Sequence, residues 1–345
     1  MLQYNRLRWV MLLGNLLAIV SARPFEFVSR DNPQNELYVV EKFLVTTKDA
    51  AQAVRDYWTT ERLASIDHDP ISTNTTPVPE NEEYRGAEFN GQGDIPRTVG
   101  RLLYTELTEE SGWRDSSCTA TLVQSDNKAT IVTAAHCLKP NVMTQNHTEW
   151  NENILFLPGF RDNLPQVNFT INRAYLESSW VYEGLTYFND RAFAVLNSDL
   201  ASGQAAGLVI GAAQDIQFGT EPPYGPLYNL GYPRYSSDKE EFRYGSPAFT
   251  GRRLAACYGE AEAWWRFPSD LAGFPCQMSG GSSGGPHLAN FDMERGVGTV
   301  VAVNSILDQN ARPPEGIVFE YGMSVTTSFS KLLYEAAQGV KLELV

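Results

Sequence analysis

The stretch CQMSGGSSGGPHL, from Cys276 to Leu288, decides how the rest of the chain is interpreted. Glycines and serines fill its middle, and such a run loses much backbone entropy on folding while it buries little surface. A flexible surface linker is one explanation for this composition. The other is a tight turn that exposes a serine nucleophile and lets the backbone approach a substrate. The second explanation needs partner residues elsewhere in the chain.

His136 is the residue that could activate Ser283 in this turn. It follows the apolar run IVTAA, which is typical of a buried β-strand that ends at the histidine. A serine hydroxyl is a weak nucleophile until a neighbouring base activates it, and imidazole is such a base. The backbone amides of the turn can also point at a developing oxyanion. Together the two residues predict acyl-transfer chemistry.

A catalytic histidine also needs a carboxylate that fixes its tautomer and stabilises the imidazolium. Asp190 in NDRAFAVLN immediately precedes an apolar strand that would bury it. Asp162, Asp199 and Asp215 also follow His136 in the chain, but none leads into such a strand. We therefore predict Asp190 as the partner of His136.

The motifs TAAHC and GGSSGGP resemble those of the trypsin/chymotrypsin family of serine peptidases. The segments TVGRLLYT, SCTATLV, NLGYP and CQMSGGSSGGP are similar to the glutamyl-endopeptidase-like branch of that family, and the resemblance covers roughly Thr98 to Leu333. It implies an all-β fold of two antiparallel six-stranded β-barrels with the catalytic groups in the cleft between them. The many short β-type runs after Thr98 agree with a barrel or sandwich. One helix is expected near the C-terminus, from about Ser330 to Gln338, with Ser328 or Ser330 as its cap.

The resemblance also assigns roles to individual residues. By motif, His136 would be the general base, Asp190 its orienting carboxylate and Ser283 the nucleophile. The amides of Gly281 and Ser283 would form the oxyanion hole. No metal or organic cofactor is implied.

Two departures from the family pattern concern activation and specificity. Ser282 stands where trypsin-like enzymes carry the aspartate that pairs with a freed N-terminus. The strand GTVVAVNS has no histidine, although glutamate-specific members place one there, and Gln277 stands where an aspartate would select Arg or Lys. We expect a specificity pocket without a fixed charge, lined near Gln277, Val303, Asn304 and Ser305.

The N-terminus predicts export. Arg6 and Arg8 precede an apolar run from Val10 to Val20, which is too short for a membrane helix of ~20 residues. This pattern, followed by small residues, predicts a signal peptide over residues 1–22 and a secreted, extracellular protein; an N-terminal anchor is the alternative. No later segment of the sequence has the apolar length to span a bilayer, so we expect no membrane association in the mature form.

Export makes the four cysteines interpretable as two disulfides. The sequence alone permits three pairings, of which we predict the neighbouring ones, Cys118–Cys137 and Cys257–Cys276. The resemblance supports the first pair, as the family's disulfide beside the catalytic histidine. Zinc is the competing use of cysteine, but C-x-x-C is absent from the sequence. Asn74, Asn146 and Asn168 begin sequons and are glycosylation candidates.

Residues 23–97 differ in composition from the chain after Arg97. Lys48 to Ile66 has the apolar spacing of an amphipathic helix, and a polar linker rich in Pro, Asn, Thr and Glu comes after it. We predict a pro-segment that is removed after Arg97, which leaves a peptidase domain over residues 98–345. A small accessory domain is the alternative explanation.

The net charge of −14 argues against a nucleic acid partner, because phosphate binding needs clustered Lys and Arg. We expect a monomer that acts on protein or peptide substrates.

Two alternative functions remain. One alternative is an inactive relative that serves as a secreted binding protein. The other is an α/β-hydrolase, since Gly281 to Gly285 also fits G-x-S-x-G; that fold needs its histidine well after the serine, and only His287 comes later in the chain. His68, His147 and His287 are expected at the surface or in the pro-segment.

Overall fold

The computed structural model describes residues 37–66, 86–109, 111–141, 149–162, 167–183, 189–220, 224–234, 249–263, 271–276, 278, 280–312 and 317–342. All of them belong to one compact unit, Leu37–Val345. The predicted signal peptide, the sequons at Asn74 and Asn146, and Gln277 lie outside the described residues. In the described part, no helix is both long enough and apolar enough to cross a bilayer.

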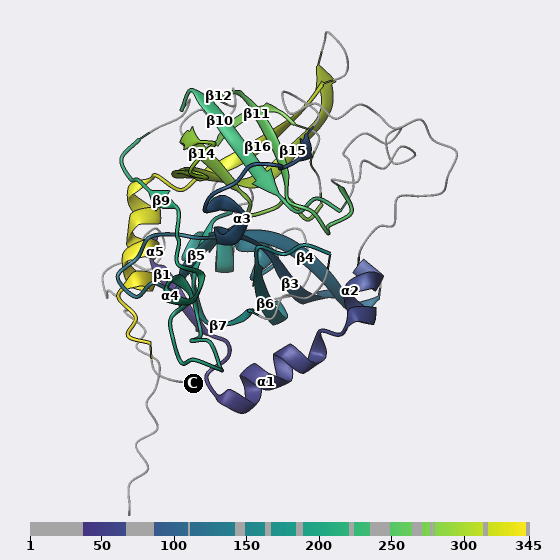
Figure 1. The fold of residues 1–345 in the computed structure, drawn as a ribbon, viewed down its shortest axis with the longest axis vertical. Helices are drawn as coiled ribbons and strands as arrows, with labels where there is room; N and C mark the ends of the chain where they lie inside the picture. Colours follow the sequence, from purple (N-terminus) through teal and green to yellow (C-terminus); the bar gives the residue numbers. More distant parts are fainter. Residues whose placement is uncertain are drawn as a thin grey trace, which may run out of the picture. The chain divides into compact units, whose positions relative to one another are not determined.

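The first sheet closes into a six-stranded antiparallel barrel (Figure 1). Its strand order is β1-β7-β6-β3-β4-β5-β8, and an additional β7–β8 pairing closes the barrel while β1 adds a seventh strand at the edge. The strands are β1 (Val39–Phe43), β3 (Val99–Thr108), β4 (Gly112–Leu122), β5 (Thr130–Thr133), β6 (Glu152–Pro158), β7 (Phe169–Glu177) and β8 (Ala192–Leu196). Every residue of β5 and β8 is buried, as expected for the short apolar runs TIVT and AFAVL.

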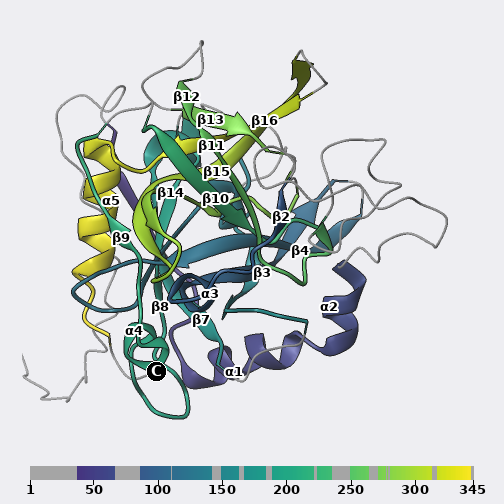
Figure 2. The same ribbon diagram turned by 45° about the horizontal axis from the view of Figure 1, so that its top comes forward.

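The second sheet has the strand order β12-β13-β16-β15-β14-β10-β11-β2, with β9 paired to β15. Its strands are β2 (Ala87–Glu88), β9 (Asp215–Ile216), β10 (Pro226–Gly231), β11 (Ala255–Glu260), β12 (Glu262–Ala263), β13 (Leu271–Pro275), β14 (Pro286–Asp292), β15 (Val297–Arg312) and β16 (Ile317–Ser324). In Figure 2 this sheet lies beside the first barrel, and β3, β4 and β10 run near the junction between them. The predicted all-β fold with two β units is confirmed, with short extra strands at the edges of the second unit.

The helices are short and lie around the sheets. They are α1 (Lys48–Tyr57), α2 (Thr60–Ile66), α3 (Ile95–Thr98), α4 (Ala206–Ile210) and α5 (Ser328–Gln338), with a 3₁₀ turn at Ala135–Cys137 and a π-helical turn at Ser179–Glu183. The predicted C-terminal helix is present as α5. Its cap is Thr327, whose side chain accepts a hydrogen bond from Ser330 N, rather than either predicted serine.

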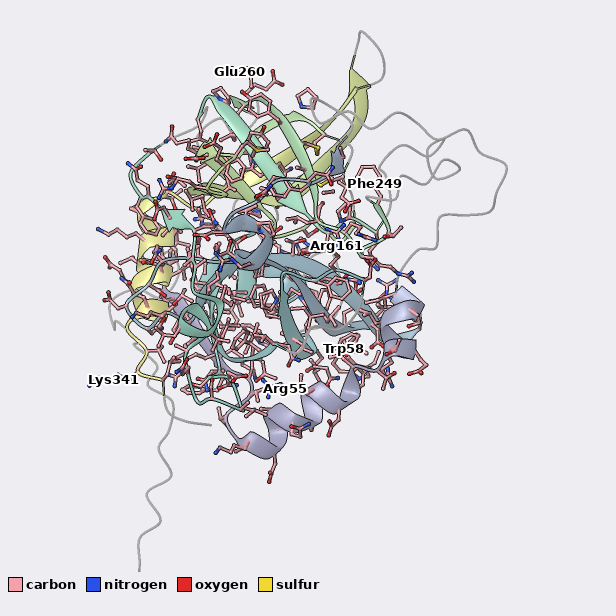
Figure 3. All side chains as sticks on the ribbon, in the orientation of Figure 1. Arg55, Trp58, Arg161, Phe249, Glu260 and Lys341 are labelled. Carbon is pink, nitrogen blue, oxygen red and sulfur yellow. A yellow bond between two sulfur atoms is a disulfide. The ribbon has the colours of Figure 1, made fainter. Side chains whose placement is uncertain are left out.

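The predicted helix over Lys48 to Ile66 is two helices, because Trp58 interrupts it. The backbone of Trp58 is extended, and its indole Nε1 donates a hydrogen bond of 2.7 Å to Asn153 O at the start of β6. Thr59 then begins the next helix, since its Oγ1 accepts from Arg62 N. Figure 3 shows Trp58 directed from the helices toward the strands of the first barrel. The tertiary contact of the indole therefore outweighs the helical pattern.

The segment before residue 67 packs onto the first barrel. β1 extends the sheet by pairing antiparallel with β7, and the guanidinium of Arg55 donates to Asn168 Oδ1 and Asn168 O. The buried apolar side chains that join it to the core are Val45, Ala51, Val54, Trp58, Leu63 and Ile66. Its removal as a pro-segment stays a prediction, and the glycosylation of Asn168 stays one too.

Both predicted disulfides are present. Cys118 in β4 is bonded to Cys137, with 6.1 Å between the Cα atoms, and Cys257 in β11 to Cys276, with 5.8 Å. Each bond joins residues separated by 19 positions. The first one lies directly next to His136.

Candidate active site

The pairing of β5 with β8 brings His136 and Asp190 together. His136 lies in the 3₁₀ turn just after β5, and Asp190 lies just before β8; Thr133 and Ala192 are partners where the two strands meet. His136 Nδ1 is 2.8 Å from Asp190 Oδ2, and the backbone amide of His136 donates to Asp190 Oδ1 at 2.9 Å. The carboxylate thus holds both the ring and the backbone of the histidine, which fixes the orientation of the imidazole.

His136 and Asp190 each favour the charged form of the other. Burial lowers the pKa of His136, but the Asp190 carboxylate raises it by more, so the net pKa lies above the ordinary 6.5. Burial raises the pKa of Asp190, but His136 and the Ser305 hydroxyl lower it, and the net pKa lies below 3.8. The His136 side chain keeps 30% exposure while Asp190 keeps 5%, so only the histidine can meet a substrate.

A residue of the second sheet also contacts Asp190, and an ion pair lies next to it in the sequence. The hydroxyl of Ser305, a residue of β15 that was predicted to line the specificity pocket, donates to Asp190 Oδ2 at 2.7 Å. Next to Asp190, the buried Arg191 pairs with Glu177 at 3.3 Å. The sequence around Ser305 does not indicate its hydrogen bond to Asp190, because the two residues are 115 positions apart.

The turn that carries Ser283 is fastened to the first barrel through Thr119 of β4. The amide of Thr119 donates to Ser283 O at 2.8 Å, and its hydroxyl donates to Gly281 O at 2.8 Å. Cys137 Sγ lies 3.7 Å from Ser283 O, and Cys118 Sγ lies 3.9 Å from His136 Nε2. Ser283 and His136 therefore both lie against the Cys118–Cys137 disulfide.

No hydrogen bond joins the Ser283 hydroxyl to His136 among the described residues. Such bonds are often long in the free enzyme and tighten only when a substrate binds.

Glycine is required at two positions of the turn. Gly281 has φ +103°, and a Cβ there would lie 2.4 Å from Tyr232 O. Gly284 has φ +79°, and a Cβ there would lie 2.1 Å from Thr133 Oγ1. In the described part, the amides of Gly281 and Ser283 donate to no other group. The composition of the turn thus results from close packing and leaves two amides available for a ligand.

A buried neutral network lies behind Ser282. Asn304 Nδ2 donates to Ser282 O at 3.1 Å and to Asn229 Oδ1 at 2.7 Å, and Asn304 Oδ1 is 2.6 Å from His287 Nε2. The expectation that His287 lies at the surface is wrong, because its exposure is 0%. Burial lowers the pKa of His287 to about 4, against the opposing effect of its bond to Asn304, so this histidine is neutral at pH 7.

Three of the residues predicted to line a specificity pocket lie in β15. Val303 and Asn304 are both fully buried, and Ser305 is half-buried beside Asp190. Cys118, His136 and Cys137 also lie within ligand distance of one another, but both sulfurs are in a disulfide and offer no thiolate.

Solved structures of serine proteases are similar to this chain. A thermostable serine protease, AL20, from an extremophilic microorganism is 25% identical, with a TM-score of 0.56 over 72% of this chain and 99% of its own. The protease Anisep from Arthrobacter nicotinovorans is 24% identical, with a TM-score of 0.56 over the same shares. A Glu endopeptidase is 17% identical, with a TM-score of 0.51 over 76% of this chain and all of its own.

No protein-family model and no curated protein matches the sequence. The two β units, the C-terminal helix and the similar structures together confirm the resemblance seen in the motifs. The chain is a member of the trypsin/chymotrypsin-like group of folds, with serine proteases, a Glu endopeptidase among them, as its structural neighbours.

Proposed function

We propose that the protein is a serine endopeptidase that hydrolyses peptide bonds through an acyl-enzyme. The observation that carries the proposal is the double contact of Asp190 with His136, beside the glycine turn of Ser283. The serine proteases among the structural neighbours support the same reaction class.

In the proposed reaction, His136 Nε2 takes the proton of the Ser283 hydroxyl as Oγ attacks the carbonyl carbon. The amides of Gly281 and Ser283 donate to the oxyanion of the tetrahedral intermediate. His136 then gives its proton to the leaving amine, and the C–N bond breaks. A water molecule, deprotonated by His136, hydrolyses the ester and restores Ser283. Asp190 remains a carboxylate throughout and stabilises the imidazolium.

We further propose that the protein is secreted after loss of residues 1–22 and acts on protein or peptide substrates. Two disulfides support an oxidising compartment. The uncharged side chain of Ser282 supports activation without the ion pair of trypsin, because a serine cannot supply the carboxylate that would pair with a freed N-terminus.

We also propose that the chain is cleaved between Arg97 and Thr98. The local structure limits the access of a peptidase to this peptide bond. Arg97 lies in α3 and is paired with Asp94, while Thr98 is fully buried and its Oγ1 accepts from Gln214 Nε2 at 2.9 Å. A peptidase can reach this bond only after α3 opens. Up to Ile66, the described part of the preceding segment contacts β4, β6 and β7, and its buried apolar side chains join the core of the first barrel, which favours a role in folding or stability.

A serine-directed organophosphate tests the proposed function. The full-length protein should be labelled at one serine, and Ser283→Ala should abolish the label together with peptide hydrolysis. Ser282→Ala is the matched control, since it removes the neighbouring hydroxyl and should still be labelled. A folded wild-type protein that takes no label would favour the inactive binding protein, and a labelled Ser283→Ala would show that the nucleophile is elsewhere.

A further inference from the structure

A pocket of about 480 Å³ opens between α2 and the start of β4. Its lining includes Tyr57, Arg62, Trp113, Arg114, Asp115 and Arg234. Cavities of this size accommodate small ligands or a few peptide side chains. Three arginines in one pocket are unexpected in a chain whose net charge is −14.

Among the described residues, two of the arginines have carboxylate partners and the third has none. Arg62 pairs with Asp115 at 2.9 Å, and Arg114 pairs with Glu106 at 2.5 Å. Arg234 forms no ion pair with any described residue, and its Nε is buried without a hydrogen-bond partner. A guanidinium presents several donors in a fixed plane that fits a carboxylate. The pocket therefore has the charge and the donor group to bind an anion.

Arg234 also connects the pocket to the proposed oxyanion hole. Its amide donates to Gly280 O at 2.7 Å, and a Cβ on Gly281 would lie 3.1 Å from Arg234 Cγ. The stem of Arg234 thus packs against the residue whose amide would bind the oxyanion. A peptide with its scissile carbonyl at this amide has its neighbouring residues within reach of the pocket.

The position of His136 indicates which half of the peptide reaches it. The leaving amine must lie at His136 Nε2, which is 3.9 Å from Cys118 Sγ. Cys118 lies on β4, and the same strand leads back to Trp113 and Asp115 in the pocket wall. The five positions from Cys118 to Trp113 span roughly 17 Å of an extended strand, a distance that a few extended peptide residues cover. The pocket thus lies on the side where the segment after the scissile bond leaves.

We propose that this pocket binds an Asp or Glu side chain of the substrate within the first few residues after the scissile bond. The proposal rests on the proposed peptidase function. Arg234 forms a charge-assisted hydrogen bond with the substrate carboxylate. Arg62 adds attraction across the pocket as long as α2, which carries it, stays bound to the first barrel. An acidic surface repels such substrates at long range, so the local arginines decide which acidic sequences are cleaved.

The test compares quenched fluorescent peptides that are identical up to the scissile bond. Pairs carry Glu or Gln at one of the first four positions after that bond, and kcat/KM is measured with the full-length protein. At the best position Glu should be preferred about tenfold over Gln, which corresponds to ~1.4 kcal/mol. The preference should disappear in Arg234→Gln, persist in Arg234→Lys and weaken at high salt.

Two further variants show whether a lost preference for Glu comes from the pocket itself or from a disturbed turn at Gly281 and Ser283. Arg62→Gln leaves Asp115 without its cation and should also reduce the Glu-to-Gln ratio, although Arg62 does not contact Gly281. Arg161→Gln, which removes an exposed arginine paired with Glu88, should leave the ratio unchanged. An active enzyme with equal kcat/KM for Glu and Gln at all four positions would refute the pocket. A protein that cleaves no peptide and takes no organophosphate would instead refute the peptidase function.

Discussion

Replacement of Trp58 tests whether the N-terminal segment is part of the cooperative fold. The Trp58 side chain is 3% exposed, and its indole Nε1 donates to Asn153 O at 2.7 Å. Truncation of a buried Trp to Ala ordinarily costs about 3–5 kcal/mol, and the lost hydrogen bond is included in that range. We therefore expect Trp58→Ala to lower the free energy of unfolding by about 3–5 kcal/mol. Trp58→Phe keeps most of the ring and should cost about 1–2 kcal/mol.

Urea unfolding of the full-length protein, monitored by far-UV circular dichroism and by activity, measures these changes. Leu208→Ala is the surface control, because Leu208 is 54% exposed, and it should change stability by less than about 0.5 kcal/mol. A loss below about 1 kcal/mol in Trp58→Ala would show that the segment is attached to the barrel without supporting it. A separate early transition for the segment would lead to the same conclusion.

The remaining predictions concern pH. Because the pKa of His136 is raised above 6.5, kcat/KM should fall as the pH decreases through a midpoint above 6.5. Asp190→Asn removes the main raising cause and leaves the effect of burial, so the midpoint of its residual activity should lie below 6.5; equal midpoints in a pH–rate profile would contradict this coupling. His287 has a pKa of about 4 when folded and an ordinary value of 6.5, so the unfolded chain binds its proton first and the fold loses stability as the pH falls from 6.5 to 4. Between pH 7 and pH 4.5 the loss should be about 2 kcal/mol, and the difference between wild type and His287→Gln in urea unfolding at these two pH values checks it.

The proximity of His136 and Asp190 could be predicted because local pattern and burial coincide there. His136 and Asp190 flank apolar runs that form β5 and β8, and the antiparallel pairing of those strands brings the two side chains together. The disulfide pairs could also be predicted, because each joins neighbouring cysteines. These predictions needed only the order of strands and the position of a residue relative to a strand end.

Contacts between distant segments could not be predicted in the same way. The sequence near Ser305 does not indicate that its hydroxyl binds Asp190. The sequence near His287 does not indicate that this histidine is buried and bonded to Asn304. The interruption of the first helix at Trp58 likewise depends on Asn153, which belongs to another part of the chain. In each case a tertiary partner decides the outcome, whereas the local pattern is equally compatible with a surface residue or a continuous helix.

The two disulfides close short local loops, Cys118–Cys137 and Cys257–Cys276, and neither of them spans Arg97. A cut after Arg97 would therefore divide the protein into two polypeptides with no covalent link. On a denaturing gel without reductant they would migrate separately, whereas in native gel filtration β1, α1 and α2 would co-elute with the barrel that they cover. From that moment the segment would be a ligand with its own dissociation constant. The stability of the barrel would then depend on protein concentration, as it never does in the uncut chain.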